Sequence, residues 1–463
     1  MRTVVAFPSS QARVDGVDVQ AWYGLRYAHA PRRFAPAEAA GGQLSVQCLQ
    51  QVPVFPQLPS RLTAAMGEGG ANPQDEDAFF LNVWAPAQAQ GLPVLLFIHG
   101  GAWMTGGSSM AWYDATRLAA QGLVVVNVNY RIGALGHLGW PQAHELPLPA
   151  ADLLLALQWV AEHVHAYGGD AGRITLMGQS AGGWYAHLLS VLPQARGMLD
   201  RVALLSMGVR QPWPTERQRM VTAAAAARVA DLSSGGADLH SAPAALVLRA
   251  GLSALPHEAF RLGYAAAAFL PVASAGLPQG LLEPGWAAQA CHARAVYLRH
   301  TADECAAFFF QTPAQRQVTQ QQVDEALASW PAADLPPSLC RHGRFLGAQS
   351  GLSPYRQLVA AASWRQFQRF PHEYAKQLRQ LGKSVQLARF TLESPLDGFH
   401  SGHCLDLPFQ FGQLSAWADA PMLAGLRLEM LEAVSRHWMA EIVSFTVRDL
   451  APHAPANGVP FAT

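Results

Sequence analysis

The most restrictive feature of this sequence is a serine enclosed by small residues, in the segment GQSAGG at residues 178–183. The apolar run RITLM precedes it directly, and the run WYAHLLSVLP, which has the apolar spacing of a helix, follows it. Glycine and serine often form flexible linkers, but a linker does not join a buried strand to a buried helix so closely. The segment therefore predicts a sharp strand-to-helix turn with Ser180 at the end of the strand.

Strand-like and helix-like patterns alternate around this turn, between about residues 92 and 210. Four runs are apolar at nearly every position, PVLLFIH, LVVVNVNY, RITLM and RVALLS, and DLLLALQWVAEHVHAYG has a helical pattern. Strands that are apolar on both faces and separated by helices indicate a parallel sheet covered on each side by helices. Two later runs, ARAVYLRH and KSVQLARFTL, extend it. We therefore expect an α/β fold with a mostly parallel central sheet.

The remaining long segments are rich in alanine and glutamine and are broken by proline and glycine, as in RQRMVTAAAAARVADL and TQQQVDEALASW. Their composition favours helices over disorder. We expect residues 1–463 to form a single domain, with helical insertions at 207–290 and 311–382 over one end of the sheet, above the active site.

Composition excludes several classes of protein. Half of the 463 residues are hydrophobic and only 14% are charged, which is not the composition of a disordered chain. Lysine plus arginine equals aspartate plus glutamate, 32 each, so we expect neither nucleic acid nor an anionic membrane as a partner. The sequence does not indicate an oligomeric state.

Two further observations bear on the compartment. The start MRTVVAFPSS has an apolar stretch too short for a signal peptide. The five cysteines are scattered, which fits neither a disulfide scaffold nor a zinc site. We expect a cytoplasmic protein with reduced thiols and no bound metal.

A strand, then G-x-S-x-G, then a helix is the context of a nucleophile elbow. The turn is so sharp that side chains two positions before or after the serine would collide with the backbone, which explains Gly178 and Gly182. The helix N-terminus supplies N–H groups and a positive dipole end beside Ser180. A purely structural glycine turn is the alternative, but the context favours Ser180 as a nucleophile.

A second glycine-rich turn, FIHGGAWMTGG, follows another buried strand and leaves the same edge of the predicted sheet. Donors to a tetrahedral oxyanion must be backbone N–H groups without bulky shielding, and small residues supply them. We assign the oxyanion hole to the N–H groups of Gly101, Ala102 and Ala181. Without the elbow, an ordinary strand-to-loop turn would be the better interpretation.

With these motifs the sequence resembles the type-B carboxylesterases, the cholinesterase and para-nitrobenzyl esterase branch of the α/β-hydrolase fold. The resemblance implies a serine esterase that hydrolyses a small-molecule ester, with a Ser-Glu-His triad in that chain order and no metal or organic cofactor. It rests on these segments: GLRYAHAP, RFAP, CLQ, DEDAFFLNVWAP, PVLLFIHGGAW, WYDATRLAAQGLVVVNVNYRIGALGHL, LQWVAEHVHAYGGDAGRITLMGQSAGG and HCLDLPFQFG.

The resemblance also selects the other two triad residues. YLRHTADECAAFFF is similar to the family's strand followed by an acidic pair, and Glu304 rather than Asp303 occupies the matching position. The family places its histidine three residues before an acid and six before an aromatic residue, which His403 satisfies and His400 does not. We therefore expect Glu304 to orient His403 and His400 to lie at the rim of the pocket or in solvent.

Two departures from the family pattern are informative. Cys48 matches a cysteine that is disulfide-bonded in secreted relatives, but its partner position holds Ala78. Gln179 stands where many relatives have a glutamate beside the nucleophile. Without that negative charge a cationic choline ester is disfavoured, so we expect neutral carboxylic esters.

Several alternatives remain open at this stage. The same triad can hydrolyse carbamates, amides or lactones, and some relatives are binding proteins without catalysis. A lipase acting at an interface is a further possibility. Substrate contacts are also open, and the aromatic candidates are more readily ordinary core residues than walls of the pocket. The candidates are Trp103, Gln179, Trp184, Phe308, Phe309 and Phe399.

Overall fold

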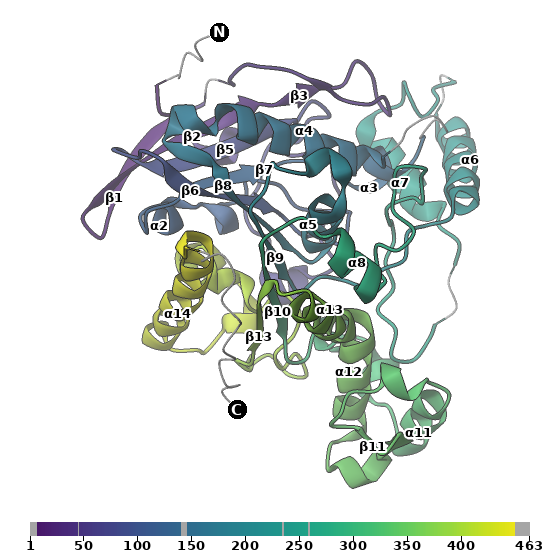
Figure 1. The fold of residues 1–463 in the computed structure, drawn as a ribbon. Helices are drawn as coiled ribbons and strands as arrows, with labels where there is room; N and C mark the ends of the chain where they lie inside the picture. Colours follow the sequence, from purple (N-terminus) through teal and green to yellow (C-terminus); the bar gives the residue numbers. More distant parts are fainter. Residues whose placement is uncertain (1–6, 45, 140–145, 234–235, 258–259, 450–463) are drawn as a thin grey trace.

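The computed structural model describes residues 7–44, 46–139, 146–233, 236–257 and 260–449. The first six residues of the start discussed above, MRTVVA, lie outside the described residues. Within the described chain the central sheet has nine strands, in the order β1-β2-β5-β7-β6-β8-β9-β10-β13 (Figure 1).

The predicted parallel sheet is present. All neighbours from β7 to β13 pair in parallel. The strands in this part are β7 (Val124–Val128), β6 (Leu92–Ile98), β8 (Gly169–Gln179), β9 (Arg201–Leu205), β10 (Ala295–Thr301) and β13 (Ser384–Phe390). Residues of β7, β9 and β10 are buried along their whole length, which accounts for their unbroken apolar runs.

Three antiparallel strands complete the sheet on its N-terminal side, and the sequence analysis did not predict them. They are β1 (Ser10–Val14), β2 (Val17–Arg26) and β5 (Phe80–Pro86). β1 and β2 are joined through Asp15 and Gly16, which both have positive φ angles, 49° and 83°. Asp-Gly is a strong signal for a two-residue hairpin turn, so the sequence did contain evidence for this pair.

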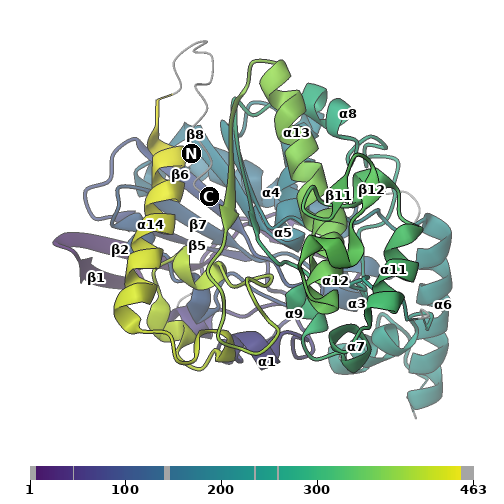
Figure 2. The ribbon, with the colours of Figure 1, turned by 90° about the horizontal axis from the view of Figure 1, so that it is seen from below.

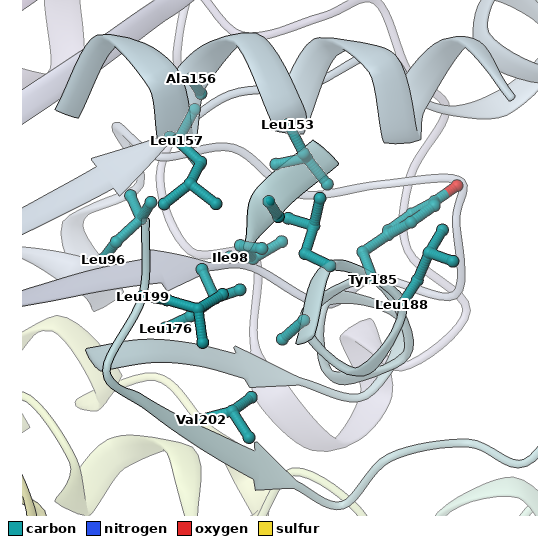
Figure 3. Close-up of a cluster of buried hydrophobic side chains, with 14 of the residues drawn as sticks. Leu96, Ile98, Leu153, Ala156, Leu157, Leu176, Tyr185, Leu188, Leu199 and Val202 are labelled. Carbon is teal, nitrogen blue, oxygen red and sulfur yellow. The ribbon is translucent and has the colours of Figure 1, made fainter. Parts of the chain in front are cut away.

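One face of the sheet is covered by α4 (Leu148–His163) and α5 (Ala181–Val191). Figure 3 shows Leu153, Ala156 and Leu157 of α4 beside Leu96 and Ile98 of β6. Successive side chains of a strand point to opposite faces of the sheet. Leu96 and Ile98 therefore both pack on the face that α4 covers.

The other face is covered by α14 (Leu428–Val447), which lies apart from α4 in Figure 1. Leu95 and Phe97, the alternate residues of β6, share a buried cluster with Ile442 and Phe445 of α14. The central strands therefore separate two hydrophobic layers, as expected of a doubly covered sheet.

Both ranges predicted as insertions contain helices, and the second also contains the short strands β11 (Cys340–Arg341) and β12 (Arg344–Phe345). Figure 2 shows α6, α11 and α12 on the side of the molecule away from α14. α13, at the end of the second range, packs on β13. The helices are α6 (Thr215–Leu232), α7 (Ala244–Ser253), α8 (Pro284–Ala290), α10 (Pro313–Arg316), α11 (Gln320–Ala328), α12 (Pro354–Ser363) and α13 (Arg369–Gln380). Among the helices described, we find none with the length and apolar character needed to cross a membrane.

Candidate active site

Ser180 occupies the turn between β8 and α5 in a conformation that few residues adopt, with φ 55° and ψ −118°. A Cβ atom on Gly178 would lie 2.2 Å from the carbonyl oxygen of Gly182, and one on Gly182 would lie 2.2 Å from that of Ile98. Both positions must therefore be glycine. The strain at Ser180 leaves its side chain partly accessible at the end of the strand.

A continuous line of hydrogen bonds joins Ser180 to two residues far away in the sequence. His403 Nε2 lies 2.8 Å from Ser180 Oγ, and His403 Nδ1 lies 2.5 Å from Glu304 Oε2. The other oxygen of Glu304 accepts a 2.8 Å hydrogen bond from the backbone N–H of Thr301. Since Glu304 and His403 are both almost fully buried, water does not compete for these bonds.

The sheet explains why these residues meet. Ser180 follows β8, Glu304 follows β10 and His403 lies in the loop after β13, and the carboxyl ends of parallel strands share one edge. A buried ion pair of 2.9 Å between Arg299 of β10 and Asp406 fixes the loop that carries His403.

The surroundings shift the pKa values of both Glu304 and His403. Burial acts to raise the pKa of Glu304, but the charge and hydrogen bond of His403, with the hydroxyl of Ser206, hold it below its usual range. Burial disfavours the imidazolium of His403, yet the neighbouring Cys404 and the carboxylate of Glu304 outweigh it, so the pKa of His403 is raised. Ser206 was not predicted from sequence; it follows β9, between the strands that lead to Ser180 and Glu304.

Asp303 and His400, which the sequence analysis did not select as triad residues, lie in a different environment. His400 Nδ1 is 2.8 Å from a guanidinium nitrogen of Arg356, and Asp303 accepts from the backbone N–H of Ser401 at 3.4 Å. Burial raises the pKa of Asp303. The structure therefore brings Glu304 and His403 to Ser180, and it leaves Asp303 and His400 beside Arg356.

The turn after β6, which carries two of the predicted oxyanion donors, has an unusual backbone conformation. Gly101 and Ala102 have positive φ angles, 118° and 54°, and a Cβ atom on Gly101 would lie 1.9 Å from the carbonyl oxygen of Thr105. Ala181 begins α5, so its N–H has no partner within the helix. In the described part of the chain no acceptor is bonded to the N–H of Gly101, Ala102 or Ala181.

The pocket candidates divide into two groups. Trp103, Trp184, Phe309 and Phe399 are buried, and the indole N–H of Trp184 donates to the carbonyl of Arg210. Gln179 is buried as well, with its amide nitrogen 3.5 Å from the sulfur of Cys404. Phe308 is different, because it is half-buried and its ring centroid lies 5.3 Å from that of His403.

Phe367, which the sequence analysis did not single out, lies on the same imidazole, with ring centroids 5.0 Å apart. It belongs to a short π-helical turn, Trp364–Gln368, between α12 and α13. Such turns often occur at functional sites, but no local motif distinguishes Phe367 from other aromatic residues.

The fold and site can be compared with known proteins. A family model described as the carboxylesterase family matches residues 9–241. The chain is 33% identical over 427 residues to a probable N-octanoylanthranilate hydrolase of Rhodococcus erythropolis, covering 90% of this chain and 86% of the relative. It is 30% identical to a phenmedipham hydrolase of Pseudarthrobacter oxydans, over 80% of this chain and 73% of that one.

Similar solved structures point to the same family as these relatives. The crystal structure of a carboxylesterase of Geobacillus stearothermophilus superposes with a TM-score of 0.72 at 26% identity, covering 95% of this chain and 88% of that chain. A para-nitrobenzyl esterase structure gives a TM-score of 0.70, also at 26% identity, over 94% and 88%. This chain belongs to the carboxylesterase family of serine ester hydrolases.

Proposed function

We propose that Ser180, His403 and Glu304 carry out carboxylic ester hydrolysis. Ser180 Oγ attacks the ester carbonyl while His403 Nε2 accepts its proton, and His403 then protonates the departing alcohol. Water, activated by the same imidazole, hydrolyses the acyl-enzyme and regenerates Ser180. The observation that carries the proposal is the line of bonds from Ser180 Oγ through His403 to Glu304 Oε2, 2.8 Å and 2.5 Å long.

The negative charge on the former carbonyl oxygen requires donors that are in place before the reaction. We assign them to the backbone N–H groups of Gly101, Ala102 and Ala181. Their support is the strained turn at Gly101 and Ala102 and the start of α5 at Ala181.

We further propose that residues 1–463 form one catalytic domain in which 207–290 and 311–382 cover the active site. Phe367 of the second range contacts His403, and its ring also lies under the guanidinium of Arg210 from the first range. These contacts support a role of both ranges in shaping the substrate pocket.

A second activity of the same site is amide hydrolysis. The relative that is 33% identical is named for N-octanoylanthranilate, an N-acyl compound. Rates on ester and amide pairs with the same acyl group separate the two activities.

A cytoplasmic, reducing location is a separate proposal. All five cysteines of the chain are free, and position 78, where the family resemblance puts the disulfide partner of Cys48, holds Ala78. Thiol titration of the denatured protein, purified without reductant, should give five reactive thiols; a lower count would contradict the proposal.

The test of the proposed mechanism uses para-nitrophenyl esters of increasing acyl length. Ser180→Ala should lower kcat/KM by roughly 10³-fold or more and abolish labelling by a fluorophosphonate. Ser253→Ala is the matched control, since Ser253 is exposed at the end of α7 and should leave both readouts unchanged. Retained turnover or labelling in Ser180→Ala would disprove the assignment of the nucleophile.

A further inference from the structure

Gln179 and Cys404 each stand next to a triad residue and contact one another. Gln179 directly precedes Ser180, and Cys404 directly follows His403. The carboxamide nitrogen of Gln179 donates a 3.5 Å hydrogen bond to the sulfur of Cys404, while Ser180 Oγ and His403 Nε2 lie 2.8 Å apart. The segments of the nucleophile and of the base are therefore joined twice, once through the reacting atoms and once through their neighbours.

The other end of the Gln179 side chain lies against the turn that carries the predicted oxyanion donors. A Cβ atom on Gly100 would lie 2.2 Å from Gln179 Oε1 and 3.0 Å from Ser180 Cβ. Gly100 directly precedes Gly101, which is one of these donors. The carboxamide thus fills the space that a side chain at position 100 would need, and it separates this turn from the loop of His403.

Both side chains of this contact are withdrawn from solvent. Gln179 is 1% exposed and Cys404 is 5% exposed. A carboxamide that binds substrate has to be accessible, whereas a buried carboxamide needs a partner within the protein. Burial therefore favours a role of Gln179 behind the reacting groups over a role as a wall of the pocket.

The backbone of the His403 loop is tied on both sides of the imidazole. The N–H of His403 donates to the carbonyl of Glu304 at 3.1 Å, and the next side chain is the one that accepts from Gln179. Cys404 has a φ angle of 73°, in the left-handed region that favours glycine. The chain thus carries a thiol where glycine would be the relaxed residue, so the contact made by this thiol accompanies a strained backbone.

We propose that Gln179 is a positioning residue: through Cys404 and Gly100 it holds the His403 loop and the oxyanion turn at their distances from Ser180. A misplacement of about 1 Å in such a site can cost about 10²-fold in rate. Because Gln179 does not touch the substrate, its loss should lower kcat and leave KM unchanged. The inference rests on the proposed function, because it assigns a supporting residue to the same Ser180 site.

The test is a double-mutant cycle between the two side chains. Gln179→Met keeps the length of the side chain and removes the donor, and Cys404→Ala removes the acceptor. With a para-nitrophenyl ester, each variant should lower kcat roughly threefold to tenfold, the factor that corresponds to one lost hydrogen bond, with KM unchanged. The rate of labelling by a fluorophosphonate should fall with kcat, because it needs the same base and oxyanion donors. The double variant should be no slower than the slower single variant, since both substitutions remove one contact.

A third variant separates positioning from packing. Cys404→Gly also removes the acceptor, but glycine suits the φ angle of 73°. Its urea midpoint should equal or exceed that of the wild type, whereas its kcat should fall as in Cys404→Ala. Cys291→Ala is the matched control, because it removes another buried thiol, at the end of α8, and should leave kcat unchanged.

Several results would overturn the positioning role and leave the triad in place. One is a wild-type kcat in Gln179→Met, and another is a double variant in which the two single effects multiply. A changed KM with an unchanged kcat would instead make Gln179 a wall of the substrate pocket. A wild-type protein with neither ester turnover nor labelling would overturn the proposed function, and the positioning role with it.

Discussion

At the scale of single residues, the imidazole of His403 is fixed from both of its nitrogens. Nδ1 bonds to Glu304, so the tautomer with a free Nε2 lone pair faces Ser180. Both oxygens of Glu304 are occupied, one by His403 and one by the N–H of Thr301, which prevents rotation of the carboxylate. The geometry therefore sets the direction of proton transfer before a substrate binds.

Replacing Glu304 by glutamine keeps the shape of this side chain and removes its charge. We expect kcat/KM to fall by roughly 10³-fold to 10⁴-fold, because the amide no longer stabilises the imidazolium or holds the required tautomer. The carboxylate contributes to the raised pKa of His403. Hydrolysis needs the neutral imidazole, so the rising acidic limb of the pH profile of kcat/KM should move to lower pH in Glu304→Gln.

The profile is measured with a para-nitrophenyl ester. Glu325→Gln, at an exposed position of α11, serves as the control and should leave both the rate and the midpoint of the limb unchanged. An unchanged midpoint in Glu304→Gln would mean that the limb does not report His403.

The residues of the site differ in how well they can be predicted from sequence alone. The segment GQSAGG is sufficient to identify the turn at Ser180, because strand, glycines and helix are contiguous. The choice of His403 over His400 depends on family spacing, since no physical property of the two segments says which imidazole approaches Ser180. Phe367 could not be predicted, because only the folded chain brings it to the site.

At the scale of elements, the β8–α5 turn is built by close approach of the backbone. The 2.2 Å separation between a Cβ atom on Gly178 and the oxygen of Gly182 leaves no room for a methyl group. The atoms that would have to move belong to the backbone beside Ser180. A change at this glycine therefore alters the position of the nucleophile as well as the packing.

Gly178→Ala is expected to lower the free energy of unfolding by about 1–3 kcal/mol, the range seen for overpacking, and to reduce kcat with it. Gly285→Ala is the matched control: it lies in α8, with no atom within 4 Å of the added methyl group. Alanine is the better helix former, so this control should leave stability unchanged or raise it by about 0.5–1 kcal/mol. Urea denaturation measures the free energy of unfolding of both variants, and ester hydrolysis measures their kcat. A Gly178→Ala protein with the stability and kcat of the wild type would contradict the packing argument.

The predictability of the elements follows from their burial. Strands β6, β7, β8 and β9 contain contiguous apolar runs and were predicted from them, whereas β10 and β13 were predicted from strand-like segments that include polar residues. β5 is also buried almost throughout, but its run FFLNVWAP gives no sign of the antiparallel direction. Likewise, no pattern in residues 311–382 shows that α13 covers β13, because its neighbours in space are set by the whole sheet.

At the scale of the whole molecule, four buried histidines link stability to pH. Burial lowers the pKa of His99, His137, His187 and His300 from 6.5 to about 4. His187, for example, is enclosed by the rings of Phe370 and Tyr374 and bonds to the carbonyl of Leu281. These side chains are neutral in the folded protein at pH values where the unfolded chain takes up protons.

Stability should therefore fall as the pH decreases from 6.5 toward 4, by about 3 kcal/mol at most for each histidine. The raised pKa of His403 acts in the other direction: its contribution is complete below the ordinary histidine pKa and is lost only at higher pH. Urea midpoints measured across this range test the expectation. His187→Gln should make stability depend less steeply on pH, whereas His437→Gln, at an exposed position, should not. Equal slopes of stability against pH in the wild type and both variants would contradict the expectation.

The separation of the triad along the chain has a consequence for biosynthesis. His403 lies 223 positions after Ser180 and 99 positions after Glu304 in the chain. A nascent chain that has folded only its first half therefore carries a nucleophile with no base to activate it. Hydrolytic activity begins only when contacts of high sequence separation have closed, which are the slowest to form. Ester turnover is thus a reporter of complete folding, and the cell is not exposed to a half-made esterase.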